Sequence, residues 1–259
     1  MLVDFSLFSI SAFRYGNVSA AIVSMGEFGL VFVIPLFLQS VLGYSALDSG
    51  VALLGLAGGA FVAAPFAVKL AERYAGRFVV RVGMALEVVG TAGLGFAFPG
   101  MAWWRFEPCL VVYGFGIGLA TAQLTSVILV DVPTAQSGEA SGIQSTSRQV
   151  GSALGIAILG TALAILFSHH ARDTLGRLPG LPVGQRAAIE QAVDERGGPV
   201  IQGLRARPGA EPVVARLGSA FASSASTVAF IASGFIALGL VSSLLLPASR
   251  PPRAADRPT

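Results

Sequence analysis

The stretch that decides the fold runs from Gly138 to Gly160 and reads G-E-A-S-G-I-Q-S-T-S-R-Q-V-G-S-A-L-G-I-A-I-L-G. In a helix with about 100° per residue, small and polar residues form one stripe: Gly142, Ser145, Gln149 and Ser152. Gly151 and Gly155 fall near the opposite edge. In water so many glycines and serines would weaken a helix, whereas in lipid they allow backbones to approach closely. The stretch therefore predicts a transmembrane helix with close neighbours on both sides, and Gly142, Gly151 and Gly155 are its expected packing residues.

The composition places the whole chain in a membrane. Apolar residues make up 54% of the sequence and charged residues 12%, and the mean hydropathy is +0.73. One cysteine excludes an internal disulfide framework, and the cysteine and histidine spacing fits no structural metal, so we expect no metal and no cofactor. The basic residues sit at predicted helix ends and in loops. This distribution fits a membrane topology and predicts no nucleic-acid partner.

Hydropathy divides the chain into about six spans, which predicts an all-α integral membrane protein without a sheet. The expected order is an amphipathic lead-in (1–17), five transmembrane helices (18–167), a hydrophilic loop (168–218), a sixth transmembrane helix (219–247) and a disordered tail (248–259). Within the loop, only residues 185–196 show helical character. An even number of spans predicts that both chain ends lie on one side of the membrane.

The charge pattern bears on which side that is. The side of the chain ends carries most of the basic residues outside the long loop: Arg14, Lys69, Arg73, Arg77, Arg81, Arg148, Arg250, Arg253 and Arg257. The opposite short loops hold Arg105, so the positive-inside rule makes the side of the chain ends cytoplasmic. Seven arginines in the loop 168–218 nearly cancel this asymmetry when they are counted. The charges alone therefore leave the orientation open.

Several segments resemble one family. The run from Ala140 to Gly160 is similar to the penultimate helix of fourteen-helix drug/proton antiporters of the major facilitator superfamily. The segments 33–50 and 113–122 are similar to other parts of that family. In the family such segments follow eight earlier helices. The resemblance thus implies a six-helix C-terminal half of a multidrug exporter in the cell membrane, with both chain ends cytoplasmic and the loop 168–218 extracytoplasmic.

The same resemblance implies the partners. A half of this kind contacts membrane lipid, a small amphipathic or hydrophobic substrate, protons and a second transporter half, which is either a separate chain or a second copy of this one. A second class of function remains open beside that of a transporter half. The chain could instead be a non-transporting membrane subunit or a truncated remnant that associates with a complete transporter.

The loop after the second span carries a degenerate motif. Residues 68–77 read V-K-L-A-E-R-Y-A-G-R and resemble the superfamily's cytoplasmic motif G-x-L-A-D-R-x-G-R-R. Glu72 stands in place of aspartate, the first glycine is a valine, and one residue is inserted. Glu72, Arg73 and Arg77 are the motif-like residues. The alternative is a solvated, positively charged loop on the cytoplasmic side.

Two carboxyl groups lie near the predicted mid-depth of the membrane, Glu27 in the first span and Glu87 in the third. A charged carboxylate there is costly unless it faces a cavity, finds a partner or exchanges protons. In the resembled family the first and fourth helices of this half line the central cavity and the third lies outside. The resemblance therefore implies that Glu27 couples protons to transport, whereas Glu87 is a packing residue that is protonated or hydrogen-bonded.

Four further residues are candidates for the cavity or the substrate. Arg148 and Gln149 lie two to three turns into the fifth span and could bind a polar substrate group or the other half. Alternatively, Arg148 extends toward the lipid headgroups and Gln149 bonds a neighbouring helix. Thr121 and Thr125 share one face of the fourth span, where they line a cavity or simply allow close packing.

Enzyme classes fit poorly. Membrane serine proteases of the rhomboid type use G-x-S-G, but the nearest match, E-A-S-G at 139–142, places a charge beside the serine. The metalloprotease motif H-E-x-x-H does not occur in the sequence. The sequence therefore predicts a protein that is not an enzyme.

Overall fold

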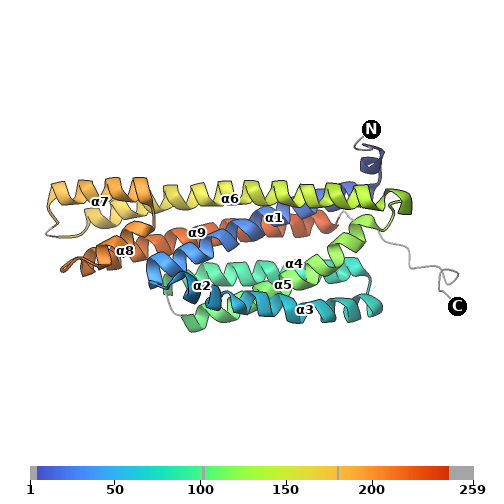
Figure 1. The fold of residues 1–259 in the computed structure, drawn as a ribbon, viewed down its shortest axis with the longest axis horizontal. Helices are drawn as coiled ribbons and strands as arrows, with labels where there is room; N and C mark the ends of the chain where they lie inside the picture. The colour runs from blue at the N-terminus through green and yellow to red at the C-terminus, as the bar shows by residue number, and fades with distance from the viewer. Residues whose placement is uncertain (1–4, 101–102, 180, 245–259) are drawn as a thin grey trace.

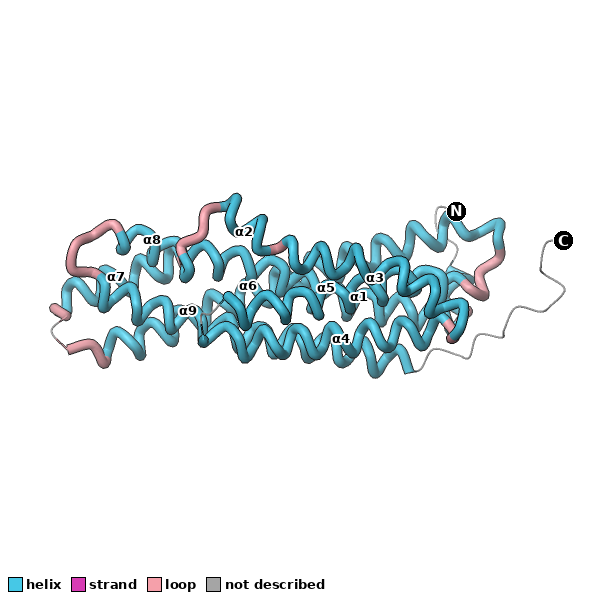
Figure 2. Tube along the Cα trace, turned by 90° about the horizontal axis from the view of Figure 1, so that it is seen from below, coloured by secondary structure: helices cyan, strands magenta, loops and turns pink. Residues whose placement is uncertain are grey.

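The computed structural model describes residues 5–100, 103–179 and 181–244, and this part of the chain consists of helices and loops (Figure 2). Six long helices dominate: α1 (Ser11–Phe37), α3 (Leu54–Arg73), α4 (Gly76–Ala97), α5 (Trp103–Leu129), α6 (Ser137–Gly176) and α9 (Glu211–Leu244). The predicted tail 248–259, the end of the predicted sixth span and residues 1–4 lie outside the described residues.

Six helical segments of the described chain are long and apolar enough to cross a membrane, which confirms the predicted all-α membrane fold. Short helices connect or extend them: η1 (Phe5–Ser9), η2 (Leu38–Leu42), α2 (Ala46–Ala52), η3 (Phe98–Gly100), η4 (Thr134–Gln136), α7 (Val183–Arg196) and α8 (Pro199–Arg205). Pro35, Pro65 and Pro108 lie inside the long helices. Membrane helices tolerate such prolines because neighbouring groups satisfy the freed backbone atoms.

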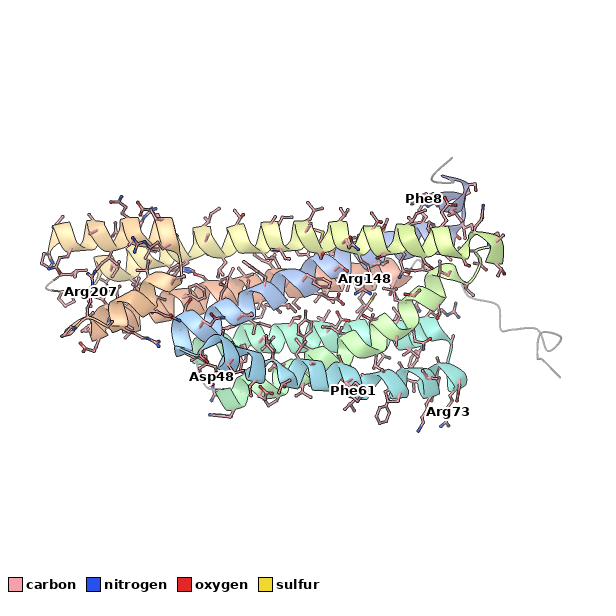
Figure 3. The ribbon with its side chains drawn as sticks, in the orientation of Figure 1. Phe8, Asp48, Phe61, Arg73, Arg148 and Arg207 are labelled. Atoms are coloured by element: carbon pink, nitrogen blue, oxygen red, sulfur yellow. The ribbon has the colours of Figure 1, made fainter. Side chains whose placement is uncertain are left out.

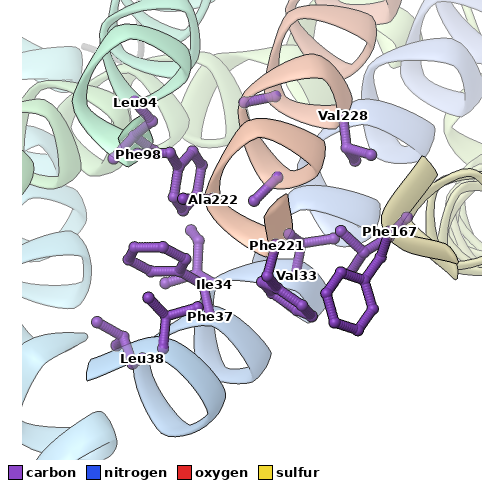
Figure 4. Packing of buried hydrophobic residues seen from close by; sticks show 14 of the residues in the cluster. Val33, Ile34, Phe37, Leu38, Leu94, Phe98, Phe167, Phe221, Ala222 and Val228 are labelled. Atoms are coloured by element: carbon purple, nitrogen blue, oxygen red, sulfur yellow. The ribbon is translucent and has the colours of Figure 1, made fainter. Parts of the chain in front are cut away.

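The long helices form two packed groups, α1 with α6 and α9, and α3 and α4 each with α5 (Figure 1). Contacts of α1 with α5 and of α4 with α9 join the two groups. Aromatic pairs pack near one end of the bundle (Figure 4). The ring centroids of Phe37 on α1 and Phe98 after α4 lie 4.7 Å apart and join the two groups, whereas those of Phe167 on α6 and Phe221 on α9 lie 5.0 Å apart within the first group. Both pairs meet edge to face, a favourable arrangement of aromatic rings.

Glycines bring α6 against α1. A methyl group added at Gly151 would collide with the carbonyl oxygen of Ala21, and one at Gly155 with that of Met25. These two predicted packing residues therefore form a seam within the chain. Gly142 behaves differently, because an added methyl group there would meet nothing within 4 Å. Gly142 is exposed, and the other residues of its stripe, Ser145, Gln149 and Ser152, line an open pocket.

The predicted loop 168–218 is largely helical. The helix α6 continues past Phe167, where hydropathy places its end, because Phe167, Ala171 and Leu175 keep one buried face at a spacing of four residues. Its 40 residues span about 60 Å, twice the thickness of the hydrocarbon core. The helix α7 covers the predicted helical stretch, whereas α8 and the early start of α9 at Glu211 were not predicted. The C-terminal end of α6 and the N-terminal end of α9 thus form, with α7 and α8, a helical extension beyond the bundle.

Hydrogen bonds fix where this extension lies. The side chain of Gln202 in α8 donates to the carbonyl oxygen of Gln39, 2.6 Å away, and Arg205 donates to that of Val41. At the other end of α1, the hydroxyl groups of Ser19 and Ser242 are 2.9 Å apart. The extension therefore lies at the end of the bundle opposite to the start of α1 and the end of α9 (Figure 1).

Candidate functional site

Charged side chains from three helices meet inside the bundle. Nη2 of Arg148 on α6 lies 3.5 Å from Oε2 of Glu27 on α1, and the Glu27 side chain is 6% exposed. Glu87 on α4 is completely buried, and its carboxyl group interacts with that of Glu27. Figure 3 shows Arg148 in the middle part of the bundle. We call Glu27, Glu87 and Arg148 the charged cluster.

The two carboxyl groups of the cluster differ in their partners. Glu27 has the guanidinium group of Arg148, whereas both side-chain oxygens of Glu87 are buried without a hydrogen-bond donor among the described residues. Glu87 is therefore a buried acid without a counter-charge of its own, because Arg148 is paired with Glu27. The cluster thus contains two carboxyl groups and one guanidinium group. With both carboxyl groups ionised its net charge is negative, and one bound proton would make it neutral.

Backbone contacts hold the two glutamates in place. The hydroxyl group of Tyr113 on α5 donates to the backbone carbonyl oxygen of Glu27, 3.0 Å away, and Tyr113 is fully buried. Gly116 lies against Glu87, because a methyl group added there would collide with the Glu87 backbone nitrogen and Cγ. Thr91 Oγ1 donates to the Glu87 carbonyl oxygen at 2.8 Å. The helix α5 therefore packs closely on both acidic residues.

An open pocket of about 370 Å³ lies beside the cluster, between α1, α5 and α6. We call it the polar pocket, and it is lined by Phe28, Thr125, Ser141, Gln144, Ser145, Arg148, Gln149 and Ser152. The side-chain amide of Gln144 donates to Thr125 Oγ1 at 3.0 Å and ties α6 to α5. Arg148 belongs both to the wall of this pocket and to the ion pair with Glu27. A ligand in the pocket would therefore contact the group that neutralises Glu27.

The structure brings together some of the predicted site residues. Gln149 and Thr125 line the polar pocket, whereas Thr121 is half-buried outside its lining. Arg148 turns inward to Glu27, so its alternative placement at the headgroups does not describe this structure. The resemblance placed the third span, α4, on the outside of the bundle. That placement did not predict that the Glu87 side chain lies near Glu27.

The motif-like residues lie apart from the cluster, where α3 ends and α4 begins. Glu72 and Arg73 are exposed and Arg77 is half-buried. The guanidinium group of Arg73 lies 5.9 Å from the ring centroid of Tyr74. Among the described residues, these side chains form no hydrogen bond or ion pair with the charged cluster. Their placement fits a solvated loop as well as the motif.

Two residues of the site escaped the sequence reasoning, Tyr113 and Gln144. Tyr113 opens the segment 113–122, but a buried tyrosine in an apolar span shows no partner in sequence. Gln144 lies on the helix predicted at 138–160 and is 4% exposed. An amide side chain within a membrane helix needs a hydrogen-bond partner, and that signal in the sequence could have marked it. In the described part of the chain, no group of three metal-binding side chains occurs.

Six membrane-length helices around a buried charged cluster and an open polar pocket define a multi-pass membrane protein. A family model described as Major Facilitator Superfamily matches residues 3–156, more than half of the sequence. The chain therefore belongs to the Major Facilitator Superfamily, a family of transporters rather than enzymes.

Curated relatives share part of this chain. It is 26% identical over 198 residues to the multidrug resistance protein Stp of Mycobacterium tuberculosis, covering 74% of this chain and 36% of that protein. It is 28% identical over 195 residues to the tetracenomycin C resistance and export protein of Streptomyces glaucescens, with the same coverages. It is 27% identical over 245 residues to the methyl viologen resistance protein SmvA of Salmonella typhimurium, covering 95% of this chain and 46% of SmvA. The chain thus spans between a third and a half of these relatives.

Proposed function

We propose that this chain forms the C-terminal half of a proton-coupled multidrug efflux transporter. The observation that carries the proposal is the charged cluster, in which Arg148 joins the Glu27 carboxylate to the wall of the polar pocket. The names of the relatives support the cargo class, because each describes resistance or export. The cargo is a small amphipathic or hydrophobic molecule that enters the polar pocket.

The cluster couples a proton to that cargo through Arg148. A carboxylate in an apolar interior remains charged only beside a counter-charge, and one arginine serves one of the two acids. Glu87 therefore keeps a proton while Glu27 is ionised. A proton that arrives at Glu27 removes the partner of Arg148 and changes the charge at the pocket wall. Binding in the pocket and protonation of Glu27 thus influence each other through one shared group.

The sign of this coupling selects the cargo that can be exchanged for protons. A cationic cargo is attracted by ionised Glu27 and repels Arg148, so its binding opposes protonation of Glu27. An anionic cargo would draw Arg148 away and favour protonation. Exchange of cargo for a proton requires that binding of the cargo oppose protonation of Glu27. The proposed cargo is therefore cationic.

Transport needs a second half across from this one. Superfamily transporters consist of two repeats related by an axis along the membrane normal, and they expose a midplane site by rocking the repeats. In this chain the polar pocket is open, and large apolar residues of α3 and α6 are exposed, among them Phe61 (84%), Phe66 (55%) and Leu154 (49%). Figure 3 shows Phe61 on the outer side of α3. A separate chain or a second copy in the same orientation would close the pocket.

The experiment is to purify the tagged chain from its native host, measure the mass of the complex in detergent, and reconstitute that complex into proteoliposomes. An imposed pH gradient should drive uptake of ethidium, a fluorescent cation, only when a second half is present. Transport by a monomer would overturn the requirement for a partner. A complex with a complete transporter whose activity is the same without this chain would favour the non-transporting subunit instead.

A further inference from the structure

A second hollow lies toward the other end of the bundle. It occupies about 430 Å³, within the size range of small-molecule sites, between the second half of α1, the middle of α6 and the turn from α7 to α8. Its walls are mostly apolar, and Phe32, Leu36, Ile156 and Phe167 contribute to them. Residues 196–199 cover one end. We call it the roofed pocket, and it shares no lining residue with the polar pocket.

Two polar side chains line the roofed end without partners. Ser40 is 3% exposed, and no other described residue hydrogen-bonds to its hydroxyl group. Arg196 forms no ion pair in the described part of the chain, unlike Arg172 with Asp194 and Arg186 with Glu190. Arg196 is exposed, so its guanidinium group is accessible to a ligand at this end of the pocket. Both side chains are hydrogen-bond donors that line this pocket.

The roof is held in position. Gly197 has a φ of 62°, which glycine adopts readily, and an added methyl group at Gly198 would collide with Ser40 Oγ and the ring of Phe221. The following helix α8 is fixed to η2 through the side chains of Gln202 and Arg205. The pocket therefore exists before any ligand arrives, which keeps the ordering cost of binding low.

We propose that the roofed pocket binds an amphipathic anion, a molecule with one acidic group and a slender apolar body. The acidic group accepts hydrogen bonds from Arg196 and Ser40, and the apolar body lies along α6 from Phe167 toward Ala157, a distance of about 15 Å. No acidic residue lines the pocket, so a cationic amphiphile would face Arg196 without a counter-charge. The proposal does not depend on the transport function, because it uses none of the charged cluster.

The test uses a twelve-carbon fatty acid with a photoreactive diazirine near its tail and the chain in phosphatidylcholine nanodiscs. After illumination, mass spectrometry should map the label to residues 156–164 of α6. Arg196→Gln should lower this labelling about tenfold, the effect of one lost charge-assisted hydrogen bond. Ala157→Trp, which fills the pocket, should also reduce it. Arg177→Gln, an exposed arginine outside the lining, is the matched control and should leave the labelling unchanged.

Probes of different charge decide the ligand class. The corresponding diazirine alcohol and amine should label these residues far less than the acid; equal labelling by either would overturn the proposal, as would labelling insensitive to Arg196→Gln. The source of the anion follows from competition. Loss of labelling when phosphatidylglycerol is added to the nanodiscs identifies a lipid headgroup, whereas competition only by unlabelled dodecanoate identifies a free amphiphile.

Discussion

At the scale of the residue, Arg148 is the side chain on which the site depends. It compensates the charge of buried Glu27 and forms part of the wall of the polar pocket. Sequence reasoning selected Glu27, Glu87 and Arg148 separately, because ionisable residues are rare within apolar spans. It could not predict that they meet, since contacts between α1, α4 and α6 depend on how the helices rotate and cross.

The first prediction tests the ion pair. Arg148→Gln should destabilise the chain by about 1–3 kcal/mol, because it leaves Glu27 buried without its counter-charge; the partial exposure of Arg148 keeps the loss below that of a fully buried pair. Adding Glu27→Gln to this variant should restore most of the stability. Thermal unfolding in nanodiscs measures both effects, and Gln149→Ala, on the exposed pocket wall, is the control. Additive losses in the double variant would argue against the pair.

At the scale of the element, the helix α6 shows both the strength and the limit of sequence reasoning. The glycine pattern predicted close packing, and Gly151 and Gly155 do meet α1. Hydropathy alone ended the helix near Phe167, because the following residues are polar on average. The buried positions Ala171 and Leu175 continue the helix as an amphipathic one. The mean hydropathy does not detect this pattern, because it averages over all faces of the helix.

The second prediction concerns the seam between α1 and α6. Gly155→Leu should lower stability by about 1–3 kcal/mol or more, because the side chain would collide with the backbone of Met25. Gly142→Leu on the same helix should have little effect in the isolated chain, since it has free space. Thermal unfolding of the two variants gives the comparison. If Gly142→Leu instead weakens assembly with the second half, the exposed stripe of α6 belongs to that interface.

At the scale of the whole molecule, composition and hydropathy were enough to predict six membrane helices, and the resemblance was enough to predict the superfamily. The orientation in the membrane remains a proposal, because the arginines of the extension nearly balance the positive-inside signal. In the helical extension only α7 was predicted, whereas α8 and the early start of α9 were not. Its turns are rich in glycine and proline, and its short helices are stabilised by contacts with α6, α9 and η2 rather than by their own sequences.

The third prediction tests the orientation. In a Cys109→Ser background, Ala187→Cys places a thiol on the exposed surface of α7. A membrane-impermeant maleimide should label it in intact cells, because the extension is expected to lie outside. A cysteine introduced at Glu72 is the control for the opposite end and should react only after permeabilisation. The reverse pattern would show that the chain is inverted.

The most direct test of the account is pH-driven transport by the assembled complex with one acid neutralised at a time. Glu27→Gln keeps the size of the side chain but cannot exchange a proton, so it should abolish gradient-driven ethidium transport while leaving ethidium binding largely intact. Glu87→Gln should retain most of the transport, because Glu87 is expected to stay protonated throughout the cycle. Undiminished gradient-driven transport by the Glu27→Gln variant would contradict the central claim, and loss in the Glu87→Gln variant alone would assign the exchanged proton to Glu87.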